Sequence, residues 1–214
     1  MKKALLFGAS GFVGSHLLQE LLNNTDYDQV TIVVRKDLAI THPKLTTLIG
    51  DYHSLPELKA DLVADDLFIA LGTTKRKTPD KAEYYRVDHD YPVLAATIAK
   101  ENGATAIFII TAVGANADSG ITYVKTKGQV EKAIIALDFQ HTHIFRPSMI
   151  LGKRSEKRLM EKSLIKLWNF INPVLPVKYK GMDGKDIAKA MNNAANNQVE
   201  KVKIYHWKEM NQLL

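Results

Sequence analysis

The chain contains no cysteine among its 214 residues. This absence excludes disulfides, zinc–thiolate sites and cysteine nucleophiles, and it fits a reducing compartment. No stretch reaches the roughly 18 uninterrupted apolar residues that a membrane-spanning helix needs. The apolar run after Met1-Lys2-Lys3 stops at Gly8, which is too short for a signal peptide. From these absences we expect a cytoplasmic protein with no membrane partner.

Two common enzyme signatures are also missing. The sequence has neither the HExxH motif of zinc proteases nor the GxSxG motif of serine hydrolases. His141 and His143 lie two residues apart on an expected strand, but no third ligand is spaced near them. We therefore predict no metal site.

Positive charge is in modest excess, with a formal net charge of +6 and a pI of about 9.3. A basic surface attracts nucleic acids, and it equally suits the phosphates of a dinucleotide. The basic residues concentrate in Lys75-Arg76-Lys77 and in residues 152–162, where acidic residues are mixed in. No aromatic residues are interleaved with these clusters, so solvated surface is favoured over nucleic acid as a partner.

Apolar runs and helical patterns alternate along the chain. Strands are expected at residues 4–7, 29–34, 44–49, 66–71, 105–111, 141–146 and 201–207. Helices are expected at 12–24, 54–63, 80–101, 122–137, 155–171 and 184–197. This alternation predicts an α/β fold with a doubly wound parallel sheet. We expect one domain over residues 1–214, with a core at 1–146 and a substrate-side extension at 147–214.

Three glycines follow the first expected strand and open the first helix, in the stretch LLFGASGFVGSHLLQELL. A glycine-rich turn at this place brings backbone N–H groups and the positive helix end onto a pyrophosphate. The GxxGxxG spacing alone is a weak signal, but its position between strand and helix strengthens it. The predicted cofactor-binding residues are Gly8, Ser10, Gly11, Phe12, Val13 and Gly14.

The choice of dinucleotide is read about 20 residues beyond the turn, where an acid would bind a ribose hydroxyl and a base would accept a 2′-phosphate. Arg35 stands 21 positions after Gly14 and is followed by Lys36. This favours NADP over NAD, the alternative being that Arg35 only faces solvent. Asp51, after the third strand, is predicted either to meet the adenine edge or to serve as a turn residue.

Tyr123 and Lys127 are spaced four residues apart near the start of an expected helix, so they share one helix face. An ammonium close to a phenol favours the phenolate and brings tyrosine nearer to acid–base work at neutral pH. Such a pair also occurs on ordinary helix surfaces. Thr111 lies at the carboxyl end of a preceding strand, where ligands bind in such sheets, and its hydroxyl could hold a substrate oxygen.

Taken together, the chain resembles the short-chain dehydrogenase/reductase superfamily, and within it the atypical branch of the Tat-interacting oxidoreductases. The stretches that carry the resemblance are GASGFVGSHLLQELL, ALGTT, YYRVDHDYP, ITAVGA, YVKTKGQVE and FRPSMILG. The resemblance implies a Rossmann-like fold with a nicotinamide cofactor over the glycine turn. It also implies that Tyr123 protonates a substrate carbonyl, and that Lys127 lowers the tyrosine pKa and contacts the nicotinamide ribose.

The resemblance assigns further positions and has one gap. It implies that the strand end Ala70, Leu71 and Gly72 lets the cofactor approach closely, and that the backbone at Pro147 and Ser148 holds the carboxamide. Asp88 is interpreted as a structural anchor. The family usually has two serines after the fifth strand, where this chain has Thr111-Ala112. Either Thr111 replaces the functional hydroxyl, or that hydroxyl is lost at Ala112.

These observations predict an NADP(H)-dependent oxidoreductase that reduces a small carbonyl compound, with NAD the less favoured cofactor. The alternative is an NADP(H)-binding regulatory or interaction protein with little turnover, a reading that Ala112 supports. A homodimer or a protein partner is possible under either hypothesis. Trp168, Phe170 and Ile171 are candidates for helix packing, a substrate pocket or a dimer seam.

Overall fold

The computed structural model describes residues 1–74, 76–152 and 176–214. In this part of the chain seven strands form one sheet, in the order β3-β2-β1-β4-β5-β6-β9, and all neighbours are parallel. Their bounds are β1 (Lys2–Phe7), β2 (Tyr27–Val34), β3 (Leu45–Ile49), β4 (Asp66–Ile69), β5 (Ala106–Ile110), β6 (His141–Phe145) and β9 (Val202–Tyr205). The sequence prediction of a parallel α/β sheet in a single domain is confirmed.

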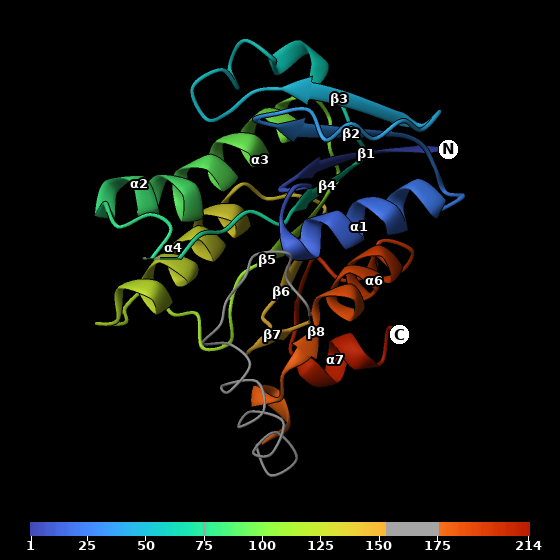
Figure 1. The fold of residues 1–214 in the computed structure, drawn as a ribbon. Helices are drawn as coiled ribbons and strands as arrows, with labels where there is room; N and C mark the ends of the chain where they lie inside the picture. The colour runs from blue at the N-terminus through green and yellow to red at the C-terminus, as the bar shows by residue number, and fades with distance from the viewer. Residues whose placement is uncertain (75, 153–175) are drawn as a thin grey trace.

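Helices cover both faces of the sheet (Figure 1). One face carries α1 (Phe12–Asn23) and α6 (Gly184–Ala194), and the other carries α3 (Tyr91–Glu101) and α4 (Thr122–Ala136). Successive strand residues point to opposite faces, so Leu6 packs under α1 while Leu5 and Phe7 pack under α3. Strands covered on both sides explain the apolar runs without alternation in the sequence.

An aromatic ladder crosses the centre of the α1 face. Phe68, Phe108 and His143 are register partners on β4, β5 and β6, and their rings stack at centroid distances of 4.7 and 4.6 Å. Tyr205 on β9 continues the ladder and stacks on Phe145 at 4.5 Å. Each fully buried large side chain contributes about 1.5–3 kcal/mol relative to exposure. The ladder therefore fixes the register of the strands on which the site is built.

Two of the expected helices differ from the prediction. The helix expected at 54–63 is wrong: only a 3₁₀ turn, Lys59–Asp61, forms, because Pro56 disfavours helical geometry at Leu55. The helix expected at 80–101 is divided into α2 (Lys81–Tyr85), a π-helical turn (Arg86–Asp90) and α3. A π turn inserts one extra residue per turn and is frequent at functional sites.

The last part of the chain also departs from expectation in detail. Helix α6 ends at Ala194, before the expected 197, and β9 ends at Tyr205, so that Trp207 opens the short helix α7 (Trp207–Asn211). The box formed by His206 and Glu209 caps α7, which is why the strand stops there. The helix expected at 155–171, with Trp168, Phe170 and Ile171, lies outside the described residues, as does Lys75.

The segment after residue 146 contributes to the main sheet, because β9 pairs in parallel with β6. It also forms a small second sheet, in which β7 (Ile150–Leu151) pairs with β8 (Met182–Asp183). The division of the domain at residue 146 stays a prediction. No helix among the described residues is long and apolar enough to cross a membrane.

The strand order reverses between β1 and β4, since β2 and β3 lie on one side and β5, β6 and β9 on the other. In such sheets the connections leave in opposite directions at this point and open a crevice at the carboxyl ends of the strands. The fold therefore places its principal cleft next to the glycine turn that follows β1.

Candidate active site

The glycine turn packs against the end of β4. Gly8 has a φ of +92°, and a Cβ built on it would lie 2.5 Å from the carbonyl oxygen of Ala70. A Cβ on Gly14 would lie only 2.0 Å from the carbonyl oxygen of Gly8. The turn can therefore close only where side chains are absent. Gly11 caps α1 without a side-chain hydrogen bond, so the positive helix end faces the cleft and suits an anionic group.

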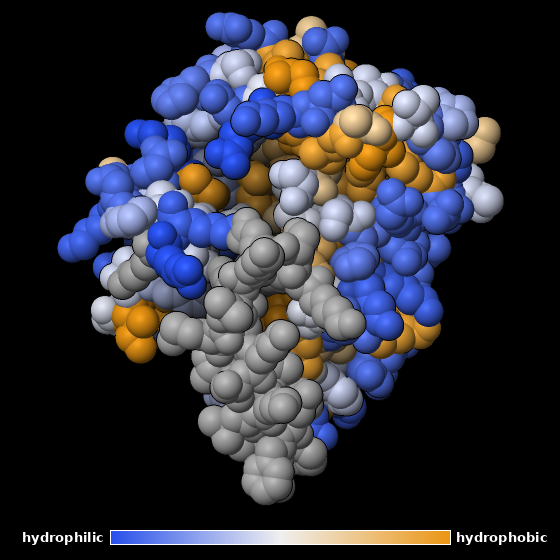
Figure 2. Space-filling view, viewed as in Figure 1, coloured by the Kyte–Doolittle hydropathy of each residue, from blue (hydrophilic) through white to orange (hydrophobic). Residues whose placement is uncertain are grey.

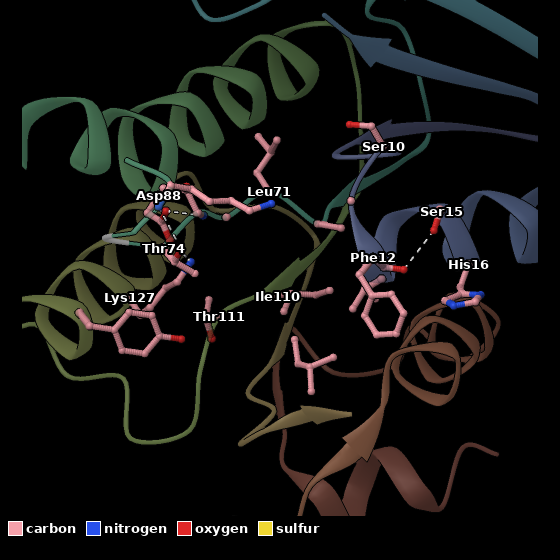
Figure 3. Close-up of a pocket in the computed structure, with 18 residues that line it drawn as sticks. Ser10, Phe12, Ser15, His16, Leu71, Thr74, Asp88, Ile110, Thr111 and Lys127 are labelled. Carbon is pink, nitrogen blue, oxygen red and sulfur yellow. Dashed lines mark hydrogen bonds and ion pairs between the residues drawn. The ribbon is translucent and has the colours of Figure 1, made fainter. Parts of the chain in front are cut away.

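A pocket of about 740 Å³ opens at this turn and extends to the start of α4. In Figure 2 the same face is hollowed near its centre, with apolar side chains in the wall of the hollow. Figure 3 shows Phe12 and His16 at one end of the pocket, Asp88 and Lys127 at the other, and Ile110 and Thr111 between them. The sequence-predicted residues that line it are Ser10, Gly11, Phe12, Val13, Ala70, Leu71, Gly72, Thr111, Tyr123 and Lys127.

The remaining predicted residues do not line this pocket: Gly8, Gly14, Arg35, Lys36, Asp51, Pro147 and Ser148. The two glycines lie behind the turn that they shape. Pro147 is buried, and its carbonyl oxygen accepts a hydrogen bond from the N–H of Val113 at 2.9 Å. That carbonyl therefore already has a partner, and the binding of a carboxamide by this backbone stays a prediction.

Arg35, Asp51 and Tyr91 lie near one another beside the first strands. Burial and the Asp51 charge raise the pKa of Tyr91 to about 12, and Arg35 opposes this rise. The Asp51 carboxylate accepts the backbone N–H groups of His53 and Ser54, which lower its pKa. Asp51 thus serves as the turn residue that was one of its two predicted roles. Arg35 and Lys36 are exposed after β2.

Lys127 and Asp88 form a buried ion pair at the far end of the pocket. Lys127 Nζ lies 2.6 Å from Asp88 Oδ1, and the two residues are 5% and 1% exposed. Asp88 Oδ2 accepts the backbone N–H of Thr73 at 2.9 Å. Asp88 comes from the π turn and Thr73 from the loop after β4. The ammonium is therefore held by a carboxylate, an arrangement that the spacing of Tyr123 and Lys127 did not reveal.

Tyr123 lines the pocket and remains 43% exposed. Burial of its hydroxyl and the negative charge of Asp88 raise the pKa of Tyr123 above its ordinary value. Lys127 is not among the causes of this shift, so the expectation that Lys127 lowers the pKa of Tyr123 stays a prediction. At neutral pH Tyr123 is consequently a phenol that still carries its proton.

Thr111 contacts a second ion pair, which is partly buried. Its hydroxyl donates to Glu131 Oε1 at 2.5 Å, and Arg146 Nε donates to the same oxygen at 2.9 Å while its terminal nitrogen binds Oε2. A hydroxyl has one proton, so Thr111 can offer a substrate only its lone pairs while this bond persists. The expectation that the Thr111 hydroxyl holds a substrate oxygen stays a prediction.

Sequence reasoning missed Glu131, although a signal was present. Tyr123, Lys127 and Glu131 repeat every four residues along α4, so they share one helix face. Glu131 is 4% exposed, and an acid so deeply buried needs a partner. The extended pattern YxxxKxxxE on a helix that covers the sheet indicates a buried acid behind the Tyr–Lys pair.

At the Phe12 end His16 lines the pocket, and the sequence did not assign it, or the lining residues Ser15, Lys77, Ile110 and Ile150, to the site. The Phe12 ring is clamped here: Cβ atoms built on Gly152 and Gly184 would lie 2.4 and 2.5 Å from it. His16, one helical turn later, meets the Phe12 ring edge to face at 5.5 Å. The glycine turn is thereby braced against the C-terminal part of the chain.

No group of three metal-ligating side chains gathers anywhere in the ranges that the structure describes. His143 is fully buried, its Nδ1 lies 2.7 Å from the Tyr205 hydroxyl, and burial lowers its pKa to about 4. His141 instead contacts the carbonyl oxygen of Glu200. The two histidines thus have separate structural partners.

Comparison with known proteins places this geometry in context. The profile of a protein family described as NAD(P)H-binding matches residues 8–166. "Protein FMP52, mitochondrial" of Candida albicans is 34% identical over 164 residues, which are 74% of this chain and 72% of that protein. "Protein FMP52-1, mitochondrial" of Scheffersomyces stipitis is 30% identical over 98% of this chain and 97% of that protein.

Solved structures share the fold at low sequence identity. MoeE5, solved in complex with UDP-glucose and NAD, has a TM-score of 0.72 and 17% identity, covering 97% of this chain and 79% of that chain. A UDP-N-acetylglucosamine 4-epimerase from Methanobrevibacter ruminantium has a TM-score of 0.71 and 18% identity, covering 96% and 76%. These likenesses confirm the Rossmann-like architecture.

The relatives correct one expectation from the sequence. Proteins of this group from Candida albicans, Scheffersomyces stipitis and Saccharomyces cerevisiae are all named as mitochondrial. The expectation of a cytoplasmic protein is therefore wrong. It rested on the absence of cysteine and of a signal peptide, and neither absence separates the cytoplasm from another reducing compartment.

Proposed function

The chain belongs to the NAD(P)H-binding family, and from this premise we propose that it is an NADP(H)-dependent oxidoreductase of the atypical short-chain dehydrogenase/reductase type acting on a small carbonyl compound. One observation carries the proposal. The glycine turn and the pair Tyr123 and Lys127 line the same pocket, although more than 100 residues separate them in the chain. A cofactor on the turn would lie in the space that Tyr123 faces.

The residues present fit a dinucleotide. Gly8 and Gly14 have no Cβ atom, and a Cβ at either position would clash with the backbone of the turn. A pyrophosphate can therefore approach the backbone at the start of α1. Gly72 borders the other end, where an added Cβ would come within 3.7 Å of Lys127 Nζ. When bound, the nicotinamide would supply or accept a hydride.

The chain's own part in carbonyl reduction is to provide a proton. Tyr123 carries that proton at neutral pH, since its pKa is raised. As hydride reaches the carbonyl carbon, the Tyr123 O–H bond breaks and its proton goes to the carbonyl oxygen, giving an alcohol. The phenolate then recovers a proton from solvent. Lys127 would contact the ribose, and Thr111 would accept a hydrogen bond from the product hydroxyl.

Arg35 supports NADP as the preferred cofactor. It is exposed at the carboxyl end of β2, beside the turn that follows β3, where a ribose 2′-phosphate would require a cation. Lys36 adds a second positive charge next to it. Asp51 and Arg35 both act on the pKa of Tyr91, so they lie near each other. The Asp51 carboxylate already accepts a hydrogen bond from the backbone N–H of His53, so it would bind the ribose hydroxyls less well.

The test is NADPH consumption by the purified protein with a panel of aldehydes, ketones and quinones. Tyr123→Phe removes the proton donor and is expected to lower turnover by about 10²–10⁴-fold with cofactor affinity unchanged. Tyr85→Phe is the matched control, because Tyr85 stacks on His89 and does not line the pocket. Equal rates in parent and Tyr123→Phe would refute the assignment.

A second candidate function is an NADP(H)-binding regulatory or interaction protein with little turnover. Two observations favour it: Ala112 lacks a hydroxyl, and the Thr111 proton is committed to Glu131. Tight NADPH binding by calorimetry, together with no turnover across the panel, would support this candidate over the reductase.

A further inference from the structure

The hydroxyl of Thr111 is a polar group in the middle part of the pocket (Figure 3). Thr111 directly follows β5 and is 5% exposed. Its backbone N–H donates to the carbonyl oxygen of Phe145 on β6 at 2.8 Å, so the sheet fixes its position. The preceding residue, Ile110, also lines the pocket and is apolar. Thr111 therefore offers a ligand one polar atom at a fixed place beside an apolar wall.

Both groups that the Thr111 hydroxyl contacts are hydrogen-bond acceptors. The hydroxyl donates to Glu131 Oε1 at 2.5 Å, and the carbonyl oxygen of Phe145 lies 3.4 Å from it. A hydrogen bond to an ionised carboxylate is shorter and roughly twice as strong as one between neutral groups, so the proton stays on the Glu131 side. The lone pairs of Oγ are what remains for a ligand.

Arg146 keeps Glu131 in the accepting state. Its Nε donates to Glu131 Oε1 at 2.9 Å, and its terminal nitrogen binds Oε2. Arginine stays charged in proteins, and an adjacent cation favours the ionised form of an acid. An ionised carboxylate accepts hydrogen bonds and donates none. Neither Glu131 nor Arg146 lines the main pocket, so a ligand there meets the Thr111 oxygen and not the acid behind it.

An oxygen that presents only lone pairs discriminates between ligand groups. A ligand hydroxyl gains a hydrogen bond there, whereas a carbonyl or ether oxygen loses its water without gaining a partner, which costs free energy. The next main-chain donor along this loop is engaged, since the N–H of Val113 donates to the carbonyl oxygen of Pro147 at 2.9 Å. In carbonyl reduction Tyr123 would donate to the reacting oxygen, so Thr111 is left to recognise a different group.

We propose that the substrate is a hydroxy-ketone or hydroxy-aldehyde whose hydroxyl group donates a hydrogen bond to Thr111 Oγ. Thr111 then determines specificity by touching the substrate, and Glu131 is a positioning residue that acts through Thr111. The inference deepens the proposed function, on which it rests for the reacting carbonyl. Because Oγ has two lone pairs, it can accept a hydrogen bond from this hydroxyl and from the product alcohol. Ketones and quinones without a hydroxyl group are disfavoured.

The test compares ketones that differ in one group. Phenacyl alcohol carries the hydroxyl, propiophenone replaces it by methyl, and phenacyl methyl ether keeps the oxygen without its proton. A second set, β-hydroxypropiophenone, butyrophenone and β-methoxypropiophenone, places the same groups one carbon further from the carbonyl. Calorimetry gives the dissociation constants for the full-length protein, with and without tetrahydro-NADPH, a cofactor analogue that cannot transfer hydride. In at least one set the hydroxy-ketone should bind about 10-fold more tightly than both analogues.

Variants of Thr111 test whether this residue causes the preference. Thr111→Val replaces the acceptor by a methyl group of similar shape, so the three ketones of a set should bind within about 3-fold of one another. Thr111→Ser keeps the hydroxyl and should keep the preference. Thr142→Val is the matched control, because Thr142 is 1% exposed on β6 and does not line the pocket. This variant should also keep the preference of the parent.

Glu131→Gln tests the positioning role. Arg146 retains the amide oxygen, so the amide N–H group turns to Thr111 and donates to it, which frees the Thr111 proton for the pocket. The preference for the hydroxy-ketone over its methyl ether should fall to about 3-fold or less. A merely structural loss would weaken all three ketones alike and leave their ratio unchanged. Glu101→Gln neutralises a half-exposed acid that pairs with Lys59, and it should leave this ratio as in the parent.

Three results would overturn the inference: equal binding of the hydroxy- and methyl ketones in both sets, no binding of any ketone to the folded parent, or a preference that persists in Thr111→Val. Circular dichroism verifies that each variant is folded. If Glu131→Gln does not fold, the ratio of hydroxy-ketone to methyl ether in the parent decides, because a committed Thr111 proton disfavours the ether. NADPH oxidation with the same ketones separates the two failures. Turnover without preference overturns this inference alone, and preferential binding without turnover overturns the proposed function alone.

Discussion

The two ends of the pocket are built from different parts of the protein. At the glycine end the binding surface is main chain, shaped by positions where no Cβ fits, such as Gly8 and Gly14. At the α4 end it includes side chains from different elements, among them Lys127 and Asp88, which form a buried ion pair, and Thr111, whose hydroxyl donates to Glu131. The glycine end requires residues without a Cβ atom, whereas the α4 end requires opposite charges that neutralise each other.

This difference predicts how each end fails. A main-chain site tolerates changes of neighbouring side chains but no added carbon at the key glycines. A site of buried charges fails when one partner is removed, because the other is left unpaired in a medium of low dielectric constant. The following predictions test that contrast.

Glu131→Ala should break the α4 end most severely. It removes the carboxylate that accepts hydrogen bonds from Thr111 and Arg146, and it leaves the guanidinium without its partner. We expect the free energy of unfolding to fall by about 3–5 kcal/mol, measured by urea denaturation. Glu101→Ala is the control, since its ion pair with Lys59 is half exposed and should contribute less than about 1 kcal/mol. Similar losses in both variants would contradict the contrast.

Gly14→Ala should break the glycine end. The added Cβ would lie 2.0 Å from the Gly8 carbonyl oxygen, so the turn must move and its N–H groups lose their alignment. We expect the dissociation constant for NADPH, measured by calorimetry, to rise by about 100-fold or more, equal to about 2.7 kcal/mol. Gly120→Ala adds a Cβ into open space and should leave binding unchanged. Parent-like affinity in Gly14→Ala would show that the turn is not the binding surface.

The buried His143 on β6 should make the stability of the protein decrease at acid pH. Burial lowers the pKa of His143 from 6.5 to about 4, so the unfolded chain binds its proton first as the pH falls. This contribution to stability is complete above pH 6.5 and is lost progressively down to pH 4, by about 3 kcal/mol in total. Replacing both His143 and Tyr205 by Phe removes the polar pair together. Denaturation of that double variant should depend less on pH over this window; an identical pH dependence would exclude His143 as the cause.

Arg35→Ala should have the smallest effect, a selective loss of NADPH affinity at the glycine end. The exposed guanidinium is placed to meet a 2′-phosphate, which NAD lacks. NADPH affinity should fall by about 10-fold, or about 1.4 kcal/mol, while NADH affinity stays the same. Lys189→Ala removes an equal charge from the exposed face of α6 and controls for the overall field of the protein. A uniform loss for both cofactors would mean that Arg35 does not read the phosphate.

Much of the fold could be predicted from the sequence, because the patterns that indicate each strand and helix lie within short segments of the chain. The continuous apolar runs of β4 and β5, and the glycine spacing before α1, each report an environment that the residues themselves need. The errors came where local signals conflict. Pro56 disfavoured an expected helix, and the regular pattern across residues 80–101 did not reveal the π turn, which carries Asp88.

The candidate site divides in the same way. Tyr123 and Lys127 were found by their spacing, and the structure places both in the pocket with the glycine turn. Their spacing did not reveal that burial and Asp88, which is 35 residues earlier in the chain, raise the pKa of Tyr123. Glu131 could have been predicted from its four-residue spacing after Lys127. Its partner Arg146 could not, because the packing of α4 on β6 brings the two residues together.

By itself, the sequence determined the alternation of strands and helices, the glycine turn after β1 and the helix face that presents Tyr123 and Lys127, because each follows from residue spacing and backbone sterics. Only the tertiary structure decided the contacts of these groups: which carboxylate holds Lys127, and which acid lies against the Thr111 hydroxyl. The physical reason is that electrostatic energies depend on distance and burial, and both are set by elements far apart in the chain.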